Sequence, residues 1–251
     1  MSFKDKVVIV TGGGSGIGAA TAELFAKEKA CVVIVGRNPD KLKKVAERCE
    51  RLCAPTLIVK ADLTKDEDLR EIVTETIDRF GQIDVLVNNA GMANFGSILD
   101  EHLMEGFDTA IQTNLRAPVY LSHLVAPYLI KTKGNIVNVS STYGTSLLGN
   151  PNFLSYCVSK AALDHFGRGA ALGLLSSGVR VNTVSPGPTR TEIIETAGLQ
   201  VSWEETSKAM KINRVSEPHE IGDLIVFLAS DKAKSITGAN YVIDNGSLVA
   251  N

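Results

Sequence analysis

Short apolar runs alternate with longer stretches of helical periodicity along this chain. Continuous apolar runs bounded by turn residues predict buried strands, whereas apolar residues at every third or fourth position predict helices that pack on a core. The expected strands are residues 6–11, 31–35, 56–60, 84–87, 135–139, 179–184 and 239–243, and the expected helices are 19–29, 40–51, 69–80, 99–133, 155–177 and 217–230. This alternation is typical of a parallel sheet covered by helices on both faces, so we predict an α/β fold.

Composition and charge narrow the possible functions. The 251 residues are 44% hydrophobic and 22% charged, with a formal net charge of -2 and a pI near 6.1. Without a basic surface or a run rich in lysine and arginine, the protein is not expected to bind nucleic acid. The chain starts directly with a strand pattern and has no run of about 18 apolar residues, so we expect a cytoplasmic protein without a membrane span.

A metal site is not expected from the cysteines and histidines. The four cysteines, Cys31, Cys49, Cys53 and Cys157, are spread along a chain that is too large to need disulfides, which indicates free thiols. The four histidines are scattered and match no ligand spacing.

A glycine-rich turn, Gly12-Gly-Gly-Ser-Gly-Ile-Gly18, follows the first expected strand. Gly12, Gly16 and Gly18 permit a tight turn and the close approach of a ligand. The helix that begins here offers unpaired N–H groups and a positive dipole end to a pyrophosphate. The spacing differs from Gly-x-Gly-x-x-Gly, so the position of the turn after the first strand carries the argument for a dinucleotide site.

The end of the second expected strand bears on the choice of coenzyme. A carboxylate here would bind the 2′-hydroxyl of NAD, whereas an arginine favours the 2′-phosphate of NADP. Gly36 leaves out the acid and Arg37 supplies the cation, so we predict NADP (NADPH), with NAD less favoured. The alternative is that Arg37 only faces solvent. Asp62, after the third strand, is expected to accept a hydrogen bond from adenine, to cap the next helix, or both.

The candidate chemistry centres on Tyr156 and Lys160. Residues four apart share a helix face, so the Lys160 ammonium is expected to lie against the Tyr156 phenol and to lower its pKa toward neutrality. Ser141 follows the strand 135–139 and would hydrogen-bond a substrate oxygen, since the chain has no Gly-x-Ser-x-Gly elbow and no histidine base for a hydrolase. Asn114 is a poor helix former inside an expected helix, which predicts a local kink or a held water.

From about residue 6 to residue 246 the chain resembles the short-chain dehydrogenase/reductase family. The matching motifs, in order, are Thr11-Gly-x-x-x-Gly-Ile-Gly18, Asp62, Asn88-Asn-Ala-Gly91, Asn114, Ser141, Tyr156-x-x-x-Lys160 and Pro186-Gly187. The resemblance implies a single doubly wound Rossmann-type domain over residues 1–251, with a seven-stranded parallel sheet, that transfers a hydride between a nicotinamide and a carbonyl or alcohol. Two departures are a longer segment between Ser141 and Tyr156, and Thr189 where an aliphatic residue is frequent.

The resemblance also implies a role for each catalytic residue. Tyr156 would be the general acid/base, Lys160 would lower its pKa and hold the nicotinamide ribose, and Ser141 would steady the substrate oxygen. Asn114 would hold a water that links Lys160 to solvent. The expected cofactor contacts are Gly12, Ser15, Gly16, Ile17, Gly18, Arg37, Asn38, Asp62, Leu63, Asn89, Ala90, Gly91, Tyr156, Lys160, Pro186, Gly187, Thr189 and Thr191. The helix 155–177 and the helix before it would form the contact of a homo-oligomer, a dimer or tetramer.

The segment at about 188–213 is expected to act as a substrate lid. Its apolar residues, together with others earlier in the chain, suggest a pocket for a lipophilic ketone, ketosteroid-like or 3-oxoacyl substrate, with ordinary core packing as the alternative. These residues are Phe95, Leu147, Leu148, Phe153, Ile193, Ile194, Ala197, Leu199, Val201 and Trp203. The predicted function is that of an NADP-dependent carbonyl reductase or alcohol dehydrogenase. The alternatives are a catalytically silent NADP-binding scaffold, and an epimerase or dehydratase, against which the glycine spacing and modest length argue.

Overall fold

Seven parallel strands form one sheet in the computed structural model of the chain, which describes residues 2–147, 150–195, 198, 200 and 202–250. The strand order is β3-β2-β1-β4-β5-β6-β7, and every paired neighbour is parallel. The strands are β1 Val7–Thr11, β2 Cys31–Gly36, β3 Thr56–Lys60, β4 Val85–Asn88, β5 Asn135–Val139, β6 Arg180–Pro186 and β7 Asn240–Ile243. The prediction of a doubly wound, seven-stranded parallel sheet is confirmed.

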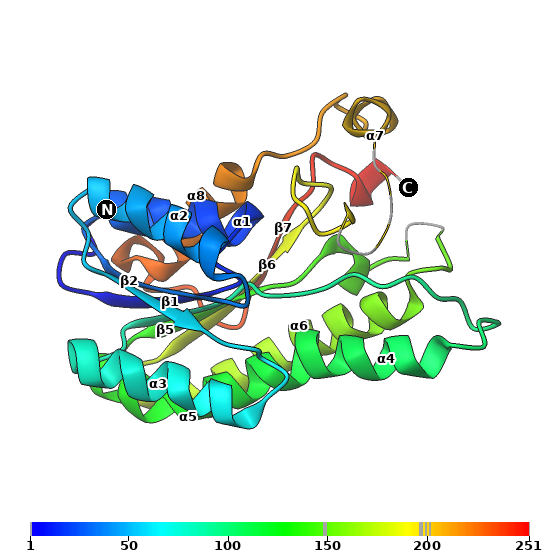
Figure 1. The fold of residues 1–251 in the computed structure, drawn as a ribbon. Helices are drawn as coiled ribbons and strands as arrows, with labels where there is room; N and C mark the ends of the chain where they lie inside the picture. The colour runs from blue at the N-terminus through cyan, green and yellow to red at the C-terminus, as the bar shows by residue number, and fades with distance from the viewer. Residues whose placement is uncertain (1, 148–149, 196–197, 199, 201, 251) are drawn as a thin grey trace.

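Helices cover both faces of the sheet, as Figure 1 shows. The first group, α1 Gly16–Lys27, α2 Pro39–Arg51 and α8 Pro218–Ala229, packs on one face; the second, α3 Asp66–Phe80, α5 Ala117–Thr132 and α6 Leu154–Leu174, packs on the other. Successive strand residues point to opposite faces, so Val8 and Val10 belong to the first core and Val7 and Ile9 to the second.

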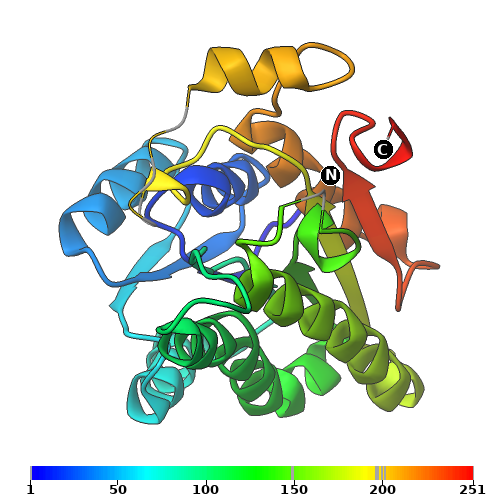
Figure 2. The ribbon, with the colours of Figure 1, turned by 90° about the vertical axis from the view of Figure 1, so that its right-hand side faces the viewer.

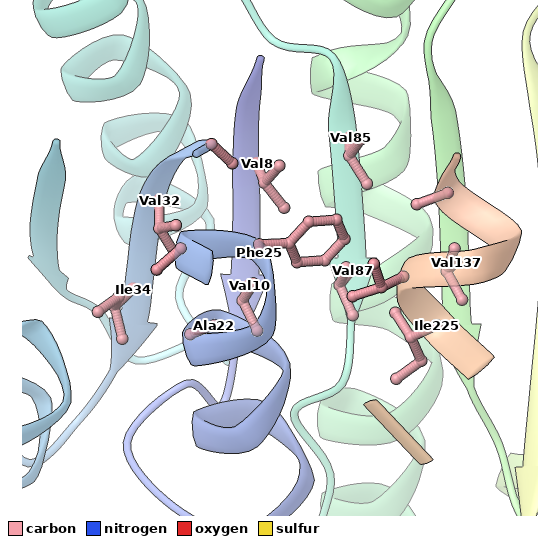
Figure 3. Close-up of a cluster of buried hydrophobic side chains, with 14 of the residues drawn as sticks. Val8, Val10, Ala22, Phe25, Val32, Ile34, Val85, Val87, Val137 and Ile225 are labelled. Carbon is pink, nitrogen blue, oxygen red and sulfur yellow. The ribbon is translucent and has the colours of Figure 1, made fainter. Parts of the chain in front are cut away.

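The core under α1 is built around Phe25. Its ring lies between the strands that carry Val8 and Val85, with Ile225 of α8 nearby (Figure 3). Phe25 is fully buried, and burying a side chain of this size contributes about 1.5–3 kcal/mol. This packing fixes α1, and therefore the glycine turn that precedes it, against the centre of the sheet.

The carboxyl ends of the parallel strands lie along one edge of the sheet, and the strand order reverses between β1 and β4. Ligands of open α/β sheets bind in the crevice outside this edge. Thr11, Gly36, Asn88, Val139 and Pro186 end their strands here, so the glycine turn and the residues that follow these strand ends lie along one edge.

Two differences from the expected helices matter for the site. The long helix predicted over 99–133 is instead α4 Leu103–Ile111, a π-helical turn Gln112–Arg116 and α5. In the segment 188–213, the helix α7 Trp203–Ala209 stands off the body of the fold, on the side of α1 and α2 (Figures 1 and 2). Among the described residues, no helix is long and apolar enough to cross a bilayer.

Candidate active site

The glycine turn joins β1 to α1 through left-handed backbone. Gly12 and Gly16 have φ of 64° and 51°, which favour glycine, and a Cβ on Gly12 would lie 2.9 Å from the Ala90 Cα. A Cβ on Gly18 would lie 2.2 Å from the Gly12 carbonyl oxygen. The first-turn N–H groups of α1 have no intrahelical acceptor, because they lie at the start of the helix. The N-cap residue, Ser15, is extended and makes no side-chain capping bond to them. The turn therefore has the shape and donors for a bound phosphate.

Hydrogen bonds fasten this turn to the end of β4. The Thr11 hydroxyl accepts from the backbone N–H groups of Asn89, at 3.0 Å, and Ala90, at 3.1 Å. The Asn89 side-chain amide donates to the Thr11 carbonyl at 2.9 Å. Two segments 78 residues apart thus form one rigid floor, and Asn89 acts as a strand bridge within it.

The residues expected near the adenosine end lie on the ends of β2 and β3. Arg37 is exposed, and its charge helps to lower the pKa of Asp62, although hydrogen bonds from the backbone and side chain of Thr64 are the larger causes. The Asp62 carboxylate accepts from the Thr64 N–H at 3.1 Å and hydroxyl at 2.8 Å. It therefore caps the turn before α3, whose own N-cap is Lys65. Asn38 caps α2 by accepting from the Lys41 N–H at 3.1 Å.

Lys41 and its surroundings were missed at the level of sequence. The Lys41 ammonium forms an ion pair with Glu192, and a Cβ on Gly14 would lie 3.3 Å from the Lys41 Cβ. Lys41 and Glu192 line a cavity of about 670 Å³ beside the glycine turn, α1 and α2. Trp203 lines the same cavity. The position of Lys41 in the first turn of the helix that follows Arg37 was the available signal.

Tyr156 is buried in α6, and the Ser141 side chain lies beside its phenol. Burial raises the pKa of Tyr156 to about 12, although the neighbouring Ser141 hydroxyl opposes the shift. The expected lowering of this pKa toward neutrality is therefore wrong for the protein alone, because desolvation of the buried phenolate outweighs the opposing effect of Ser141. At neutral pH the phenol keeps its proton.

Lys160 lies one turn along the same face of α6. Its ammonium donates to the Val139 carbonyl at 2.9 Å and lies 5.8 Å from the centroid of the Tyr156 ring. Burial lowers the pKa of Lys160 to about 8, and the charge of Asp164 opposes the shift. A Cβ on Gly91 would lie 3.2 Å from the Lys160 Nζ, so glycine at 91 lets the loop after β4 pass close to the amine.

Asn114 lies in the π-helical turn Gln112–Arg116, so the regular helix expected here is interrupted at this residue. Its side-chain oxygen accepts from the Met92 N–H at 2.8 Å, and its side-chain nitrogen donates to the Met92 carbonyl at 2.9 Å and the Ser159 hydroxyl at 3.0 Å. The amide thereby holds the loop after β4 against α6. A π-helical turn displaces the regular backbone bonding, a feature frequent at functional sites.

Aromatic side chains surround the Tyr156 ring. Phe153 lies 4.4 Å from Phe95 and 5.0 Å from Tyr143 between ring centroids, and Ile193 packs on the same cluster. Ile193, a residue of the expected lid, thus packs against the cluster that contains Tyr156. Trp203, by contrast, lines the separate cavity beside α1.

The other residues of the expected pocket differ in placement. Leu147 is half exposed, and Ile194 is partly buried. Four further members, Leu148, Ala197, Leu199 and Val201, lie outside the described residues.

The segment after β6 closes the other side of the edge. The Gly187 N–H donates to the Ile243 carbonyl at 3.0 Å, and the Thr189 hydroxyl donates to the Gly187 carbonyl at 3.0 Å. Thr191 faces the glycine turn, since a Cβ on Gly16 would lie 3.0 Å from its Cγ2. Ile17 and Leu63, two further expected contacts, lie partly buried against the first and the second core.

The doubly wound sheet, its glycine turn at the switch point and the Tyr156–Lys160 pair define a Rossmann-type oxidoreductase. A family model described as enoyl-(acyl carrier protein) reductase matches residues 12–247, and the chain belongs to the short-chain dehydrogenase/reductase family. It is an oxidoreductase that uses a nicotinamide coenzyme to transfer a hydride to or from an alcohol or carbonyl group.

Three relatives illustrate the likeness. The chain is 35% identical to a 3-oxoacyl-[acyl-carrier-protein] reductase of Thermotoga maritima, over 99% of this chain and 100% of that protein. It is 32% identical to a cyclohexanol dehydrogenase of Acinetobacter sp. (strain SE19), over 96% and 94%. A solved short chain dehydrogenase from Burkholderia cenocepacia in complex with NADP has a TM-score of 0.91 at 30% identity, covering 99% of this chain and 100% of that one.

Proposed function

We propose that the protein is an NADPH-dependent carbonyl reductase, or the corresponding alcohol dehydrogenase, in which Tyr156 is the general acid/base. The observation that carries this proposal is the buried Tyr156 phenol beside Ser141, with the Lys160 ammonium one helical turn away and 5.8 Å from the Tyr156 ring centroid. These groups lie beside the sheet edge at which Rossmann-type folds bind dinucleotides.

The coenzyme-holding residues are proposed from the shape of the edge. The open N–H groups of residues 16–18 hold the pyrophosphate, Arg37 the 2′-phosphate, and Lys160 the nicotinamide ribose. The segment from Pro186 to Thr191 covers the carboxamide side. When bound, the nicotinamide supplies or accepts the hydride.

The protein's own groups manage the proton. In reduction, Tyr156 donates its phenolic proton to the substrate oxygen, which Ser141 also hydrogen-bonds as negative charge develops. The positive charge of Lys160 then stabilises the phenolate, since a cation within about 6 Å favours the charged form. Asn114 fixes the loop at Met92 that runs past Lys160.

The decisive variant is Tyr156→Phe, which removes only the hydroxyl. Its turnover is expected to fall by roughly 10²–10⁴-fold, the usual contribution of a positioned acid/base, while NADPH binding stays close to wild type. Turnover is measured on a panel of ketones and alcohols, and binding by the change in NADPH fluorescence. A variant that turns over at the wild-type rate would falsify the proposed role. Wild-type protein that binds NADPH but oxidises it with no member of the panel would support the scaffold alternative.

Coenzyme choice is a separate prediction. Arg37 is exposed at the end of β2, so its charge is available to a 2′-phosphate. We expect kcat/KM to favour NADPH over NADH, and Arg37→Leu to lower kcat/KM for NADPH by roughly tenfold with little effect on NADH, as for the loss of one charge-assisted hydrogen bond. A wild-type preference for NADH would contradict this assignment. Lys43→Leu, an exposed lysine on α2, is the matched control.

The aromatic surroundings support a lipophilic substrate. Phe95, Tyr143, Phe153 and Ile193 present apolar surface beside the reacting phenol, and such walls with a few polar groups are typical of small-molecule sites. A ketone with a hydrophobic ring or chain is therefore proposed, in preference to a sugar.

A further inference from the structure

Asp164 is a buried carboxylate one helical turn beyond Lys160. Both side chains lie on the sheet-facing side of α6, with Asp164 8% exposed and Lys160 3% exposed. Buried carboxylates of this kind persist when they are held or when they balance another charge, because burying an isolated charge is costly. No family motif quoted above includes this position.

Two neighbouring elements hold the Asp164 carboxylate in place. One oxygen accepts from the Asn240 side-chain nitrogen at 2.8 Å, and the Asn240 oxygen in turn accepts from the Ser185 hydroxyl at 2.8 Å. The Ser140 hydroxyl, which donates to the Lys160 carbonyl at 3.1 Å, lies beside the carboxylate. Asn240 of β7, itself held by Ser185 of β6, thus fixes one oxygen of the carboxylate, and the other oxygen has no hydrogen-bond partner among the described residues.

Few other charges act on this pair. From its own helix, Lys160 is faced by Tyr156 and by the carboxylate of Asp164. The groups that approach it from other elements are the Val139 carbonyl, Asn114 and Gly91, and these three are uncharged. Asp164 is faced by Lys160 and Arg168 from α6, and by the uncharged Ser140 and Asn240 from the strands. Within the described part of the chain, Asp164 is therefore the carboxylate that acts on the catalytic amine.

We propose that Asp164 is a positioning residue that acts through Lys160, keeping the amine in its charged form without touching substrate or coenzyme. This inference rests on the proposed function, in which the charge of Lys160 stabilises the Tyr156 phenolate. The attraction between the carboxylate and the ammonium opposes the desolvation of the amine. Tyr156, Lys160 and Asp164 thus place a phenol, an amine and a carboxylate at successive turns on one face of α6.

The test is the pH profile of kcat for ketone reduction in Asp164→Asn. Loss of the carboxylate lowers the pKa of Lys160 further, so the amine loses its proton at a lower pH and the alkaline limb of the profile moves to lower pH by about one unit. At pH 8, kcat is expected to fall roughly fivefold, the change in protonated fraction when a pKa of about 8 drops by about one unit. The KM for NADPH is expected to stay near wild type.

Three further variants keep the result interpretable. Asp84→Asn removes a buried carboxylate at the opposite edge of the sheet and is expected to lower stability while leaving the alkaline limb where it is. Asp164→Glu keeps the charge and should restore most of the limb. Asn240→Ala releases the carboxylate without removing it, and is expected to move the alkaline limb in the same direction by a smaller amount. This variant tests the role of Asp164 if Asp164→Asn does not fold.

The outcomes separate this inference from the proposed function. An unmoved alkaline limb in both Asp164→Asn and Asn240→Ala, with Tyr156→Phe still inactive, would overturn the role of Asp164 alone. If Tyr156→Phe kept its turnover, the proposed function itself would fail, whatever the behaviour of Asp164.

Discussion

At the scale of single residues, Lys160 carries a conflict between stability and chemistry. Its amine is buried beside a phenol, and burial lowers its pKa to about 8 from the ordinary 10.5. The charged form is therefore less favourable in the folded protein than in the unfolded chain. The proposed mechanism needs the charge that folding disfavours, and perturbed pKa values of this kind are common at functional sites.

This conflict predicts how stability depends on pH in Lys160→Met. Between about pH 8 and 10.5 the unfolded chain binds more protons at this position than the folded protein, so the lysine contribution to wild-type stability rises with pH across that window. Below about pH 8 the cost of the buried charge is fully present. Wild type should therefore gain stability relative to Lys160→Met as the pH rises from 8 to 10, measured by urea unfolding.

The comparison needs a surface lysine and a limited pH range. Lys43→Met on α2 is exposed and should show a constant difference from wild type over the same interval. Measurements stop at pH 10. Above pH 10 the unfolded chain begins to lose the Tyr156 proton while the folded protein, with a Tyr156 pKa of about 12, keeps it, so the contribution of Tyr156 to stability falls as the pH rises. A Lys160→Met difference that is independent of pH would refute the interpretation.

At the scale of elements, α6 is the helix on which the site depends. One face carries Tyr156, Lys160 and Asp164 against the sheet, and the close approach of that face requires glycine at 167. A Cβ on Gly167 would lie 2.8 Å from the Thr183 Oγ1 and 3.2 Å from the Asn138 Nδ2, whereas a Cβ on Gly169 would meet nothing within 4 Å.

These two glycines offer the same substitution in two environments. Gly167→Ala is expected to lower the free energy of unfolding by about 1–3 kcal/mol, because the helix must move away from β5 and β6. Gly169→Ala is expected to raise it by up to about 1 kcal/mol, because alanine favours helix and the methyl group points outward. Denaturant unfolding of both variants measures the difference, and equal effects would contradict the packing argument.

At the scale of the whole molecule, the site is a meeting of segments distant in sequence. Hydrogen bonds join the ends of β1 and β4, and Lys160 of α6 approaches the loop after β4 at Gly91. The segment after β6 contacts the glycine turn through Thr191 and the Tyr156 cluster through Ile193. The Lys41–Glu192 pair ties that segment to α2, but both partners are about half exposed, so an ion pair of this kind adds little stability. The lid role of residues 188–213 stays a prediction, as does the oligomer.

Local patterns were sufficient for much of the fold and for the choice of candidate residues. The strand at 135–139 and the glycine turn at 12–18 are recognisable because burial period and turn chemistry depend on neighbours in sequence. The interruption of the regular helix at Asn114 agrees with the poor helix propensity of asparagine. The catalytic and coenzyme-binding assignments of these residues remain predictions.

What the sequence by itself determined was the order of elements and the residue types that carry chemistry, since both follow from periodicity and from short motifs. Only the tertiary structure decided the direction of the Tyr156 pKa shift, the pairing of Lys41 with Glu192, the separation of Trp203 from the aromatic cluster and the position of Asp164 behind Lys160. The physical reason is that desolvation and charge interactions depend on which distant segments enclose a group, and helix spacing alone does not contain that information.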